Sequence, residues 1–318
     1  MARPKRDELA LLAAADLLRE QEEQELVYTT SYLAQVCLPY RDPGDVPVWQ
    51  RRNGDIVMTV RPGYTTDPLS GKAVSLGYPT GVVPRWALFY VINEALQNES
   101  PTIVLGDGVV EFFRKINPEG KITGGKTGSL TRMITQTNKL FNAAISVERK
   151  RVGPDGERAT LTTNMSVAHR VLMWGEGGDD RAVIQLSADF FDEIMNHAVP
   201  LDLGALRIFG DDAWCIDLYN FLNWQFHNMQ GRKTALTIPL DEVNAQFGNA
   251  RQLTTPPARY KFRKALESKL DRVMKVWDDA NVELTTSGLI LRPSRPHVRD
   301  RGQLVVEKSA STQLMLEA

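Results

Sequence analysis

Residues 259–277 read RYKFRKALESKLDRVMKVW, the most regular helical pattern in the second half of the chain. Its apolar residues recur at intervals of three or four, which is the spacing of one buried face of an α-helix. These residues are Phe262, Leu266, Leu270, Val273 and Trp277. The polar stripe consists of Lys261, Lys264, Ser268, Arg272 and Lys275. Because residues 259–275 carry seven bases against two acids, the stretch predicts an amphipathic helix with a cationic free face.

A second stretch of the same kind, SLTRMITQTNKLFN, occupies residues 129–142. Its apolar face would consist of Leu130, Met133, Ile134, Thr137, Leu140 and Phe141, and its polar face of Ser129, Arg132, Gln136 and Lys139. It lies within residues 114–158, which carry a net charge of +6, whereas residues 176–243 carry −8. The overall net charge of −1 therefore hides two basic segments separated by an acidic one.

The same order of elements surrounds both basic helices: helix, strand, short helix, basic helix and hairpin. In the first copy these are expected at 85–98, 102–105, 107–116, 129–142 and 144–167, and in the second at 213–229, 234–238, 240–247, 259–277 and 282–293. This is the element order of a winged helix, and its recurrence indicates a tandem repeat. The sequence therefore predicts an α+β chain with two tandem winged-helix domains, at residues 75–175 and 183–293.

The residues outside these two copies are expected to form an N-terminal extension, 1–74, and a flexible tail, 294–318. The extension would contain an acidic helix followed by a hairpin. Seven acids face one base between Asp7 and Glu25, so this helix should avoid nucleic acid and serve as a surface or partner-binding helix.

Composition excludes several classes of protein. The chain has 318 residues and no run of about 18 to 20 uncharged apolar residues, so no membrane span is expected and the location is cytoplasmic by default. The two cysteines, Cys37 and Cys215, are too few for a disulfide framework. The four histidines lack metal-ligand spacing, so neither a metal nor a cofactor is expected.

Cationic helices of this size suit double-stranded DNA. A helix fits a B-DNA major groove, where Arg and Lys can donate to guanine and Gln can pair with adenine. The first reading face would be Ser129, Arg132, Gln136 and Lys139, with Lys126 and the hairpin bases Arg149, Lys150, Arg151 and Arg158 on phosphates. The second would comprise Lys261, Arg263, Lys264, Ser268, Arg272 and Lys275, with Arg292 beyond the helix. A single stripe of this kind is more often a solvated face, but two copies with hairpins favour DNA binding.

The chain resembles the plasmid-encoded RepA replication initiators. The resemblance rests on LPYRDPG (38–44), WQRRNGDIVMTV (49–60), GVVPRWALFYVINEAL (81–96), VLGDGVVEFFRKI (104–116) and GGKTGSLTRMITQTNKLFNAAISVE (124–148). It covers residues 30–175 well and the second copy mainly by element order. It implies an initiator that binds repeated sites at a plasmid origin, helps to open an AT-rich segment and recruits host replication proteins. It also implies a homodimer in equilibrium with the monomer.

Two other functions compete with this interpretation. A transcriptional repressor could use the same DNA-binding modules. An ATPase is suggested by GKITGGKT (120–127), which satisfies the P-loop pattern, but a true P-loop follows a buried strand. Here an amphipathic helix is expected before the loop, so the sequence favours a protein that is not an enzyme.

Overall fold

The computed structural model describes residues 6–21, 23–104, 114, 123, 125, 128–152, 157–172, 183–248 and 253–298. Within them the fold mixes α-helices with small antiparallel sheets, which confirms the predicted α+β class at that level. The turn of the hairpin expected at 144–167, the residues between the two predicted domains and most of the short helix 107–116 lie outside the described residues. No helix in the described ranges combines the length and apolar character needed to cross a bilayer.

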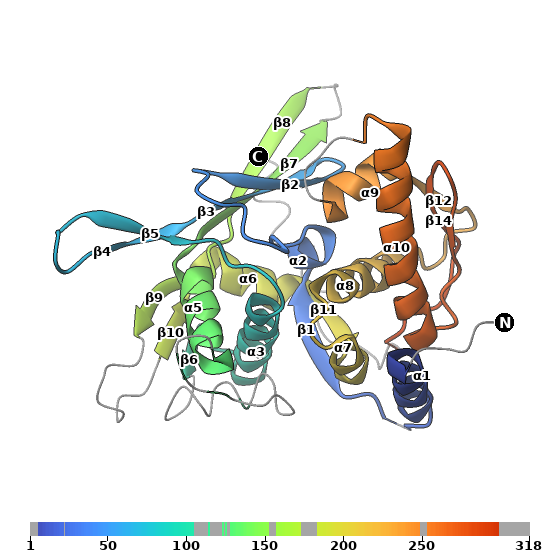
Figure 1. The fold of residues 1–318 in the computed structure, drawn as a ribbon, viewed down its shortest axis with the longest axis horizontal. Coiled ribbons are helices and arrows are strands. Elements are labelled where there is room, and N and C mark those ends of the chain that lie inside the picture. Colours follow the sequence, from blue (N-terminus) through green and yellow to red (C-terminus); the bar gives the residue numbers. More distant parts are fainter. Residues whose placement is uncertain are drawn as a thin grey trace.

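The elements follow one another as shown in Figure 1. The first half contains α1 (Arg6–Arg19), β1 (Leu26–Thr30), α2 (Ser31–Gln35), β2 (Trp49–Asn53), β3 (Ile56–Arg61), β4 (Gly63–Thr66), β5 (Ala73–Gly77), α3 (Val83–Asn98), β6 (Thr102–Val104), α5 (Ser129–Asn142), β7 (Ala144–Val152), β8 (Arg158–Asn164), β9 (Ala168–Leu172) and β10 (Val183–Leu186). The second contains α6 (Ala188–His197), β11 (Ala198–Asp202), α7 (Leu203–Phe209), α8 (Ala213–Asn228), β12 (Leu236–Pro239), α9 (Leu240–Phe247), α10 (Pro256–Val276), β13 (Val282–Leu284) and β14 (Gly288–Leu291).

The second copy of the repeat folds in the predicted element order. Helices α8, α9 and α10 surround one hydrophobic cluster, and β12, β14 and β13 pair in that order as an antiparallel sheet. Leu289 and Leu291 of β14 are buried in this cluster. Gly288 begins β14, and a side chain there would collide with the carbonyl oxygen of Ile238, so close pairing of the two strands requires glycine.

The first copy differs from the prediction in its hairpin. The strand after α3 is β6, and it pairs with β10, which pairs with β9. The order β6-β10-β9 matches β12-β14-β13, so β9 and β10 take the place that closes the sheet of the first copy. The sequence predicted that the basic hairpin β7–β8 would close this sheet, and that prediction is wrong. The hairpin instead pairs with β3, in a separate four-stranded sheet of order β2-β3-β7-β8.

Segments of the predicted N-terminal extension contact both halves of the molecule. Strand β1 pairs antiparallel with β11, from Leu26 opposite Asp202 to Thr30 opposite Ala198. The strands lead into short helices with matching caps, because Thr30 Oγ1 accepts from Leu33 N and Asp202 Oδ1 accepts from Ala205 N. Helix α2 then lies against α8. The domain boundaries stay a prediction, but residues 6–74 do not stand apart from the rest.

A buried ion pair joins α3 to α8. The Arg85 guanidinium donates from Nε and Nη2 to the two carboxylate oxygens of Asp217, at 2.8 and 2.6 Å. The exposed fractions of the two side chains are 4% and 6%. Although burial acts to lower the pKa of Arg85, the Asp217 carboxylate raises it overall. Nearby, buried Arg51 donates to the carbonyl oxygens of Gln246 and Gly248, which attaches β2 to the end of α9.

The C-terminal described residues are packed rather than free. His297 Nδ1 lies 2.8 Å from the hydroxyl of Tyr219, and its ring packs against Trp277. Val298 is buried. Residues 294–298 were assigned to the flexible tail, but among them His297 and Val298 are packed against the rest of the chain, whereas Arg295 is exposed. The remainder of the tail lies outside the described residues.

Candidate nucleic-acid interface

Helix α10 is anchored at its start by its neighbours. The Thr255 hydroxyl accepts from Ala258 N and caps the helix, and two prolines occupy its first turn. Arg259 donates to both carboxylate oxygens of Asp241, at 2.9 and 3.0 Å, and so ties α10 to α9. The apolar face predicted from the sequence is the one that packs on the core, because Phe262, Leu266, Leu270, Val273 and Trp277 are all buried.

The N-terminal half of α10 presents its cations to solvent. Lys261, Lys264 and Ser268 are exposed and Arg263 is half-buried. Among the residues that the structure describes, none of the three cations has an ion-pair partner. Tyr260, which sequence analysis did not include, stands beside them, with the Lys264 ammonium 6.0 Å from its ring centroid. We name the group Tyr260, Lys261, Lys264 and Ser268 the open face of α10.

The C-terminal half of α10 is neutralised within the molecule. Lys269 Nζ lies 2.6 Å and Arg272 Nη1 3.2 Å from Asp212 Oδ2, at the start of α8. Arg272 also donates to the carbonyl oxygens of Ile208 and Phe209 at the end of α7. Burial acts to raise the pKa of Asp212, but the hydrogen bond from Lys269 and its charge lower it overall. These cations hold α10 against α7 and α8.

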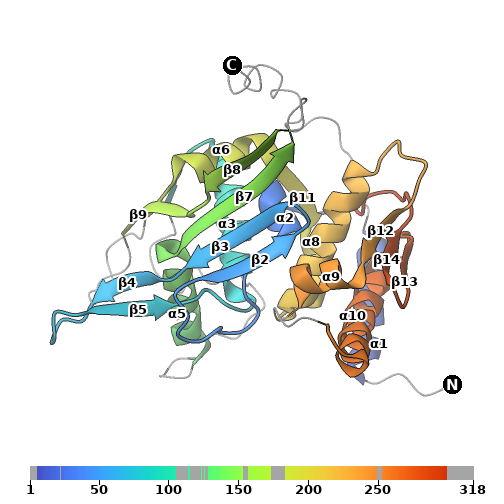
Figure 2. The same ribbon diagram turned by 90° about the horizontal axis from the view of Figure 1, so that it is seen from above.

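Helix α1 covers the last turn of α10. Lys275 Nζ lies 2.6 Å from Glu8 Oε1 and 2.8 Å from Asp271 Oδ2. Arg19 of α1 donates to the Lys275 carbonyl oxygen at 2.6 Å, and Ala15 is fully buried. Figures 1 and 2 both show α1 alongside α10. The acidic helix was expected to be a surface or partner-binding helix, and within the described residues it contacts a basic helix of its own chain.

The polar face of α5 is crossed by the segment 77–81, which follows β5. Thr80 N donates to Gln136 Oε1 at 2.7 Å. Lys139 is only 15% exposed, with its ammonium 3.9 Å from Asp42 Oδ2. A Cβ at Gly77 would lie 3.0 Å from that ammonium, and Gly77 also has a φ of +78°, so glycine is favoured there on both grounds.

The other residues predicted on α5 are placed differently. Arg132 is exposed, and the Ser129 hydroxyl accepts from Thr123 N at 2.8 Å. Lys126 and most of GKITGGKT lie outside the described residues. Of the predicted reading face of α5, only Arg132 projects into solvent without a partner among the contacts that the structure describes.

The predicted wing bases are divided between two faces of the β7–β8 hairpin. Neighbouring strand residues point to opposite faces, so Arg149 and Arg151 lie on one face and Lys150 on the other. Arg149 is half-buried with its guanidinium over the ring of Tyr32, whereas Lys150, Arg151 and Arg158 are exposed. The hairpin β9–β10 occupies the place in the first sheet that was predicted for β7–β8. Its strand β9 carries an exposed cation, Arg170, that was not among the predicted DNA-binding residues. Arg292, at the end of the second hairpin, pairs with Glu283 at 2.6 Å.

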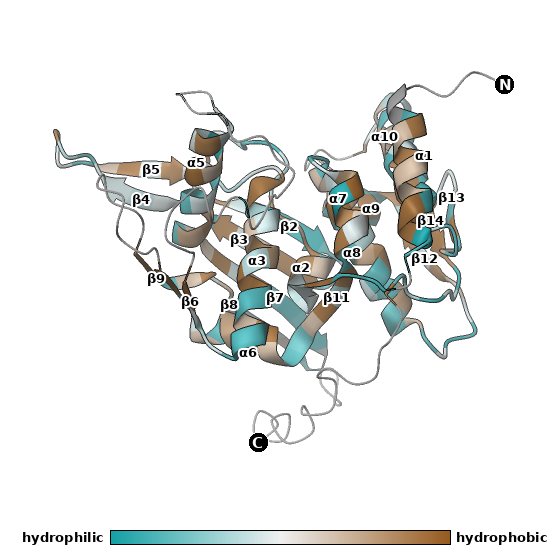
Figure 3. Cartoon of the chain, turned by 90° about the horizontal axis from the view of Figure 1, so that it is seen from below, coloured by the Kyte–Doolittle hydropathy of each residue, from teal (hydrophilic) through white to brown (hydrophobic). Residues whose placement is uncertain are grey.

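Figures 2 and 3 place α5 and α10 along the same side of the molecule. Both helices pack their apolar faces on the interior. The β4–β5 hairpin projects beyond α5, away from α10 (Figure 1).

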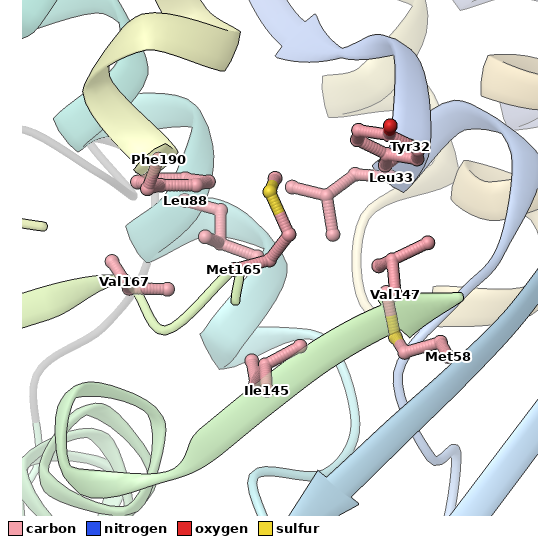
Figure 4. Close-up of a pocket in the computed structure, with 9 residues that line it drawn as sticks. All are labelled: Tyr32, Leu33, Met58, Leu88, Ile145, Val147, Met165, Val167 and Phe190. Atoms are coloured by element: carbon pink, nitrogen blue, oxygen red, sulfur yellow. The ribbon is translucent and has the colours of Figure 1, made fainter. Parts of the chain in front are cut away.

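The small cavity drawn in Figure 4 lies inside the first core. Its lining residues are apolar except for the hydroxyl group of Tyr32, and none of them is charged. Such a lining offers nothing to a phosphate or a metal. In the described part of the chain no three His, Cys, Asp or Glu side chains gather as metal ligands.

Comparisons with known proteins find a matching family model and matching solved structures. A family model described as plasmid encoded RepA protein matches residues 78–242, just over half of the chain. The crystal structure of selenomethionine derivatives of domains 2 and 3 of RctB aligns with 84% of this chain and 91% of that chain, at 12% sequence identity and a TM-score of 0.41. A likeness of that degree does not define the fold. No curated protein sequence matches the chain significantly.

Proposed function

The chain belongs to the family of plasmid-encoded RepA proteins, and from this premise we propose that it is a plasmid replication initiator that binds repeated double-stranded sites at an origin. After binding, it would promote opening of an adjacent AT-rich segment and recruit host replication proteins in the cytoplasm. A homodimer in equilibrium with the monomer belongs to the same proposal. These roles require binding and deformation of DNA and no catalytic residue.

The DNA-binding unit in this proposal is a pair of winged helices. In the second, α8, β12, α9, α10 and the hairpin β13–β14 follow one another in the order of that fold. In the first, α3, β6, α5 and the hairpin β9–β10 take the corresponding places, and β7–β8 is an insertion. The boundaries expected from the sequence, 75–175 and 183–293, would place β10 (Val183–Leu186) in the second unit, whereas in this proposal its pairing with β6 and β9 assigns it to the first. The common side of α5 and α10 would meet successive major grooves of one duplex (Figure 2).

The observation that carries the proposal is the open face of α10. Lys261 and Lys264 project into solvent on a helix that buries its other face, and the structure describes no carboxylate paired with either lysine. Exposed, unpaired cations on an anchored helix favour a polyanion, because binding releases counterions from DNA at no cost of breaking internal pairs. The N-terminal residues of a recognition helix are also the ones that usually reach base edges.

Duplex binding by the double variant Lys261→Ala, Lys264→Ala tests this proposal. The unaltered chain should bind a plasmid origin duplex with an affinity that falls steeply between about 50 and 200 mM salt. The variant should bind about 10 to 100 times more weakly, with a shallower dependence on salt concentration. The matched control is Arg52→Ala, Lys72→Ala, which removes two exposed cations from β2 and from the β4–β5 hairpin. Equal losses in both variants, or a flat salt response, would refute the proposal.

A further inference from the structure

Tyr260 is an aromatic side chain that the core of the protein does not use. It is 58% exposed and belongs to neither hydrophobic cluster, whereas Phe262, two positions on, is buried. A single exposed apolar residue is common on protein surfaces and needs no explanation by itself. Two further observations make Tyr260 informative: its position on the open face of α10 and its contact with a cation.

The Lys264 ammonium lies 6.0 Å from the centroid of the Tyr260 ring, one helical turn further along. A cation at this distance from an aromatic face is attracted weakly by the ring. Tyr260 nevertheless stays more than half exposed to solvent. Because Tyr260 lies near the start of α10, it occupies the part of a recognition helix that enters a groove most deeply.

We infer that Tyr260 is a specificity-determining residue that packs its ring against the 5-methyl group of a thymine in the major groove. The inference rests on the proposed function. The thymine methyl is the apolar group that base pairs present in that groove. The polar neighbours Lys261, Lys264 and Ser268 are suited instead to hydrogen bonds with the edges of bases. The open face would then combine one apolar contact with several polar ones.

The spacing of the helix adds a constraint on the site. Tyr260 and Lys264 are four residues apart, about 6 Å along the helix at 1.5 Å per residue. Base pairs are stacked at about 3.4 Å, so the two side chains address positions one or two base pairs apart. Lysine prefers the O6 and N7 atoms of guanine. The recognised sequence should therefore contain a guanine within about two base pairs of the critical thymine.

Uracil substitution tests the contact, because uracil differs from thymine only by the missing methyl group. The probes are duplexes selected by the full chain from a random pool, with each thymine replaced by uracil in turn. At one thymine the replacement should weaken binding of the unaltered chain about fourfold, the value expected for one buried methyl group. Tyr260→Ala should bind the two duplexes equally, and Tyr260→Phe should keep the difference.

The control variant is Tyr64→Ala on the β4–β5 hairpin, since Tyr64 is similarly exposed, at 63%. It should leave the response to uracil unchanged. If Tyr260→Ala keeps that response, or if Tyr260→Phe loses it, the methyl contact is wrong although DNA binding stands. A selection that enriches no duplex, with no salt-dependent binding, would overturn the proposed function and this inference with it.

Discussion

Helices α5 and α10 have the same amphipathic pattern but different surroundings. On α10 the first half is open and the second half is clamped by Asp212 and Glu8. On α5 the polar face lies under segment 77–81, with Gln136 bonded to Thr80. A basic stripe on a helix is therefore available to a ligand only where no other part of the chain contacts it. In our proposal α10 makes most of the contacts with DNA bases, and α5 adds Arg132.

The largest expected effect concerns the clamped half of α10. Asp212→Ala removes the cap of α8, where Asp212 Oδ1 accepts from Cys215 N, and leaves Lys269 and Arg272 without their carboxylate. The free energy of unfolding should fall by about 2 to 3 kcal/mol, measured by urea denaturation at pH 7. The exposed neighbour, in Asp211→Ala, serves as control and should change stability little. If Asp212→Ala is as stable as the unaltered chain but binds DNA more weakly, the second half of α10 contacts DNA rather than stabilising the fold, which would contradict our assignment.

A smaller effect is expected in the first core, which contains a buried carboxylate. Burial raises the pKa of Glu193 to about 7, although the Ser31 hydroxyl donates to it at 2.7 Å. Arg149 and His197 are its charged or titratable neighbours, at the β7 and α6 sides. The folded state therefore holds a proton that the unfolded state loses near pH 4.5, so stability should fall as pH rises from there to about 7.

Glu193→Gln should remove this pH dependence and stabilise the protein by about 1 to 3 kcal/mol at pH 8, but not at pH 4.5. Thermal unfolding at the two pH values measures the difference. Asp192→Asn, on the exposed side of the same helix, is the matched control. A Glu193→Gln protein that is less stable at pH 8 than the unaltered chain would show that the carboxylate is needed in its charged form.

The smallest expected effect is the change in DNA affinity on substituting Gln136 of α5, which we compare with substitution of Lys264 on α10. Because Gln136 Oε1 already accepts from Thr80 N, Gln136→Ala should change affinity for a selected duplex by less than about threefold. Lys264→Ala should relax discrimination at one base by about 1 to 3 kcal/mol. Competition between selected and random duplexes measures both. If Gln136→Ala relaxes discrimination more than Lys264→Ala does, segment 77–81 must move aside in the complex.

Local patterns in the sequence predicted α3, α5, α8, α9 and α10, whereas α6 and α7 were not predicted. The bounds expected for α5 agree with Ser129–Asn142. Helix α10, expected at 259–277, begins three residues earlier and ends one residue earlier, because Thr255 caps it and the two prolines form its first turn. Period and capping are properties of neighbouring residues, so a single sequence reveals them.

Pairing between distant segments was not accessible in the same way. Strand β7 pairs with β3, with Ile56 opposite Arg149 and Arg61 opposite Ala144. No local pattern in either strand predicts which strand it will pair with. Lys275 is neutralised by Glu8, which lies 267 residues earlier in the chain. The sequence therefore placed Lys275 on the basic stripe of the helix, but it did not reveal that α1 covers this lysine. Tyr260 shared the stripe with Lys264 and could have been found from that spacing.

Site-directed photo-crosslinking tests the comparison most directly. A photoreactive group is attached to Lys264→Cys, Lys275→Cys or Gln136→Cys, and each protein is irradiated with labelled origin duplex; the native Cys37 and Cys215 are buried and should not be modified. We expect strong crosslinks from position 264, weak ones from 136 and none above background from 275. Crosslinking from 275 or 136 that equals or exceeds that from 264 would contradict the assignment of the open face of α10 as the main DNA reader.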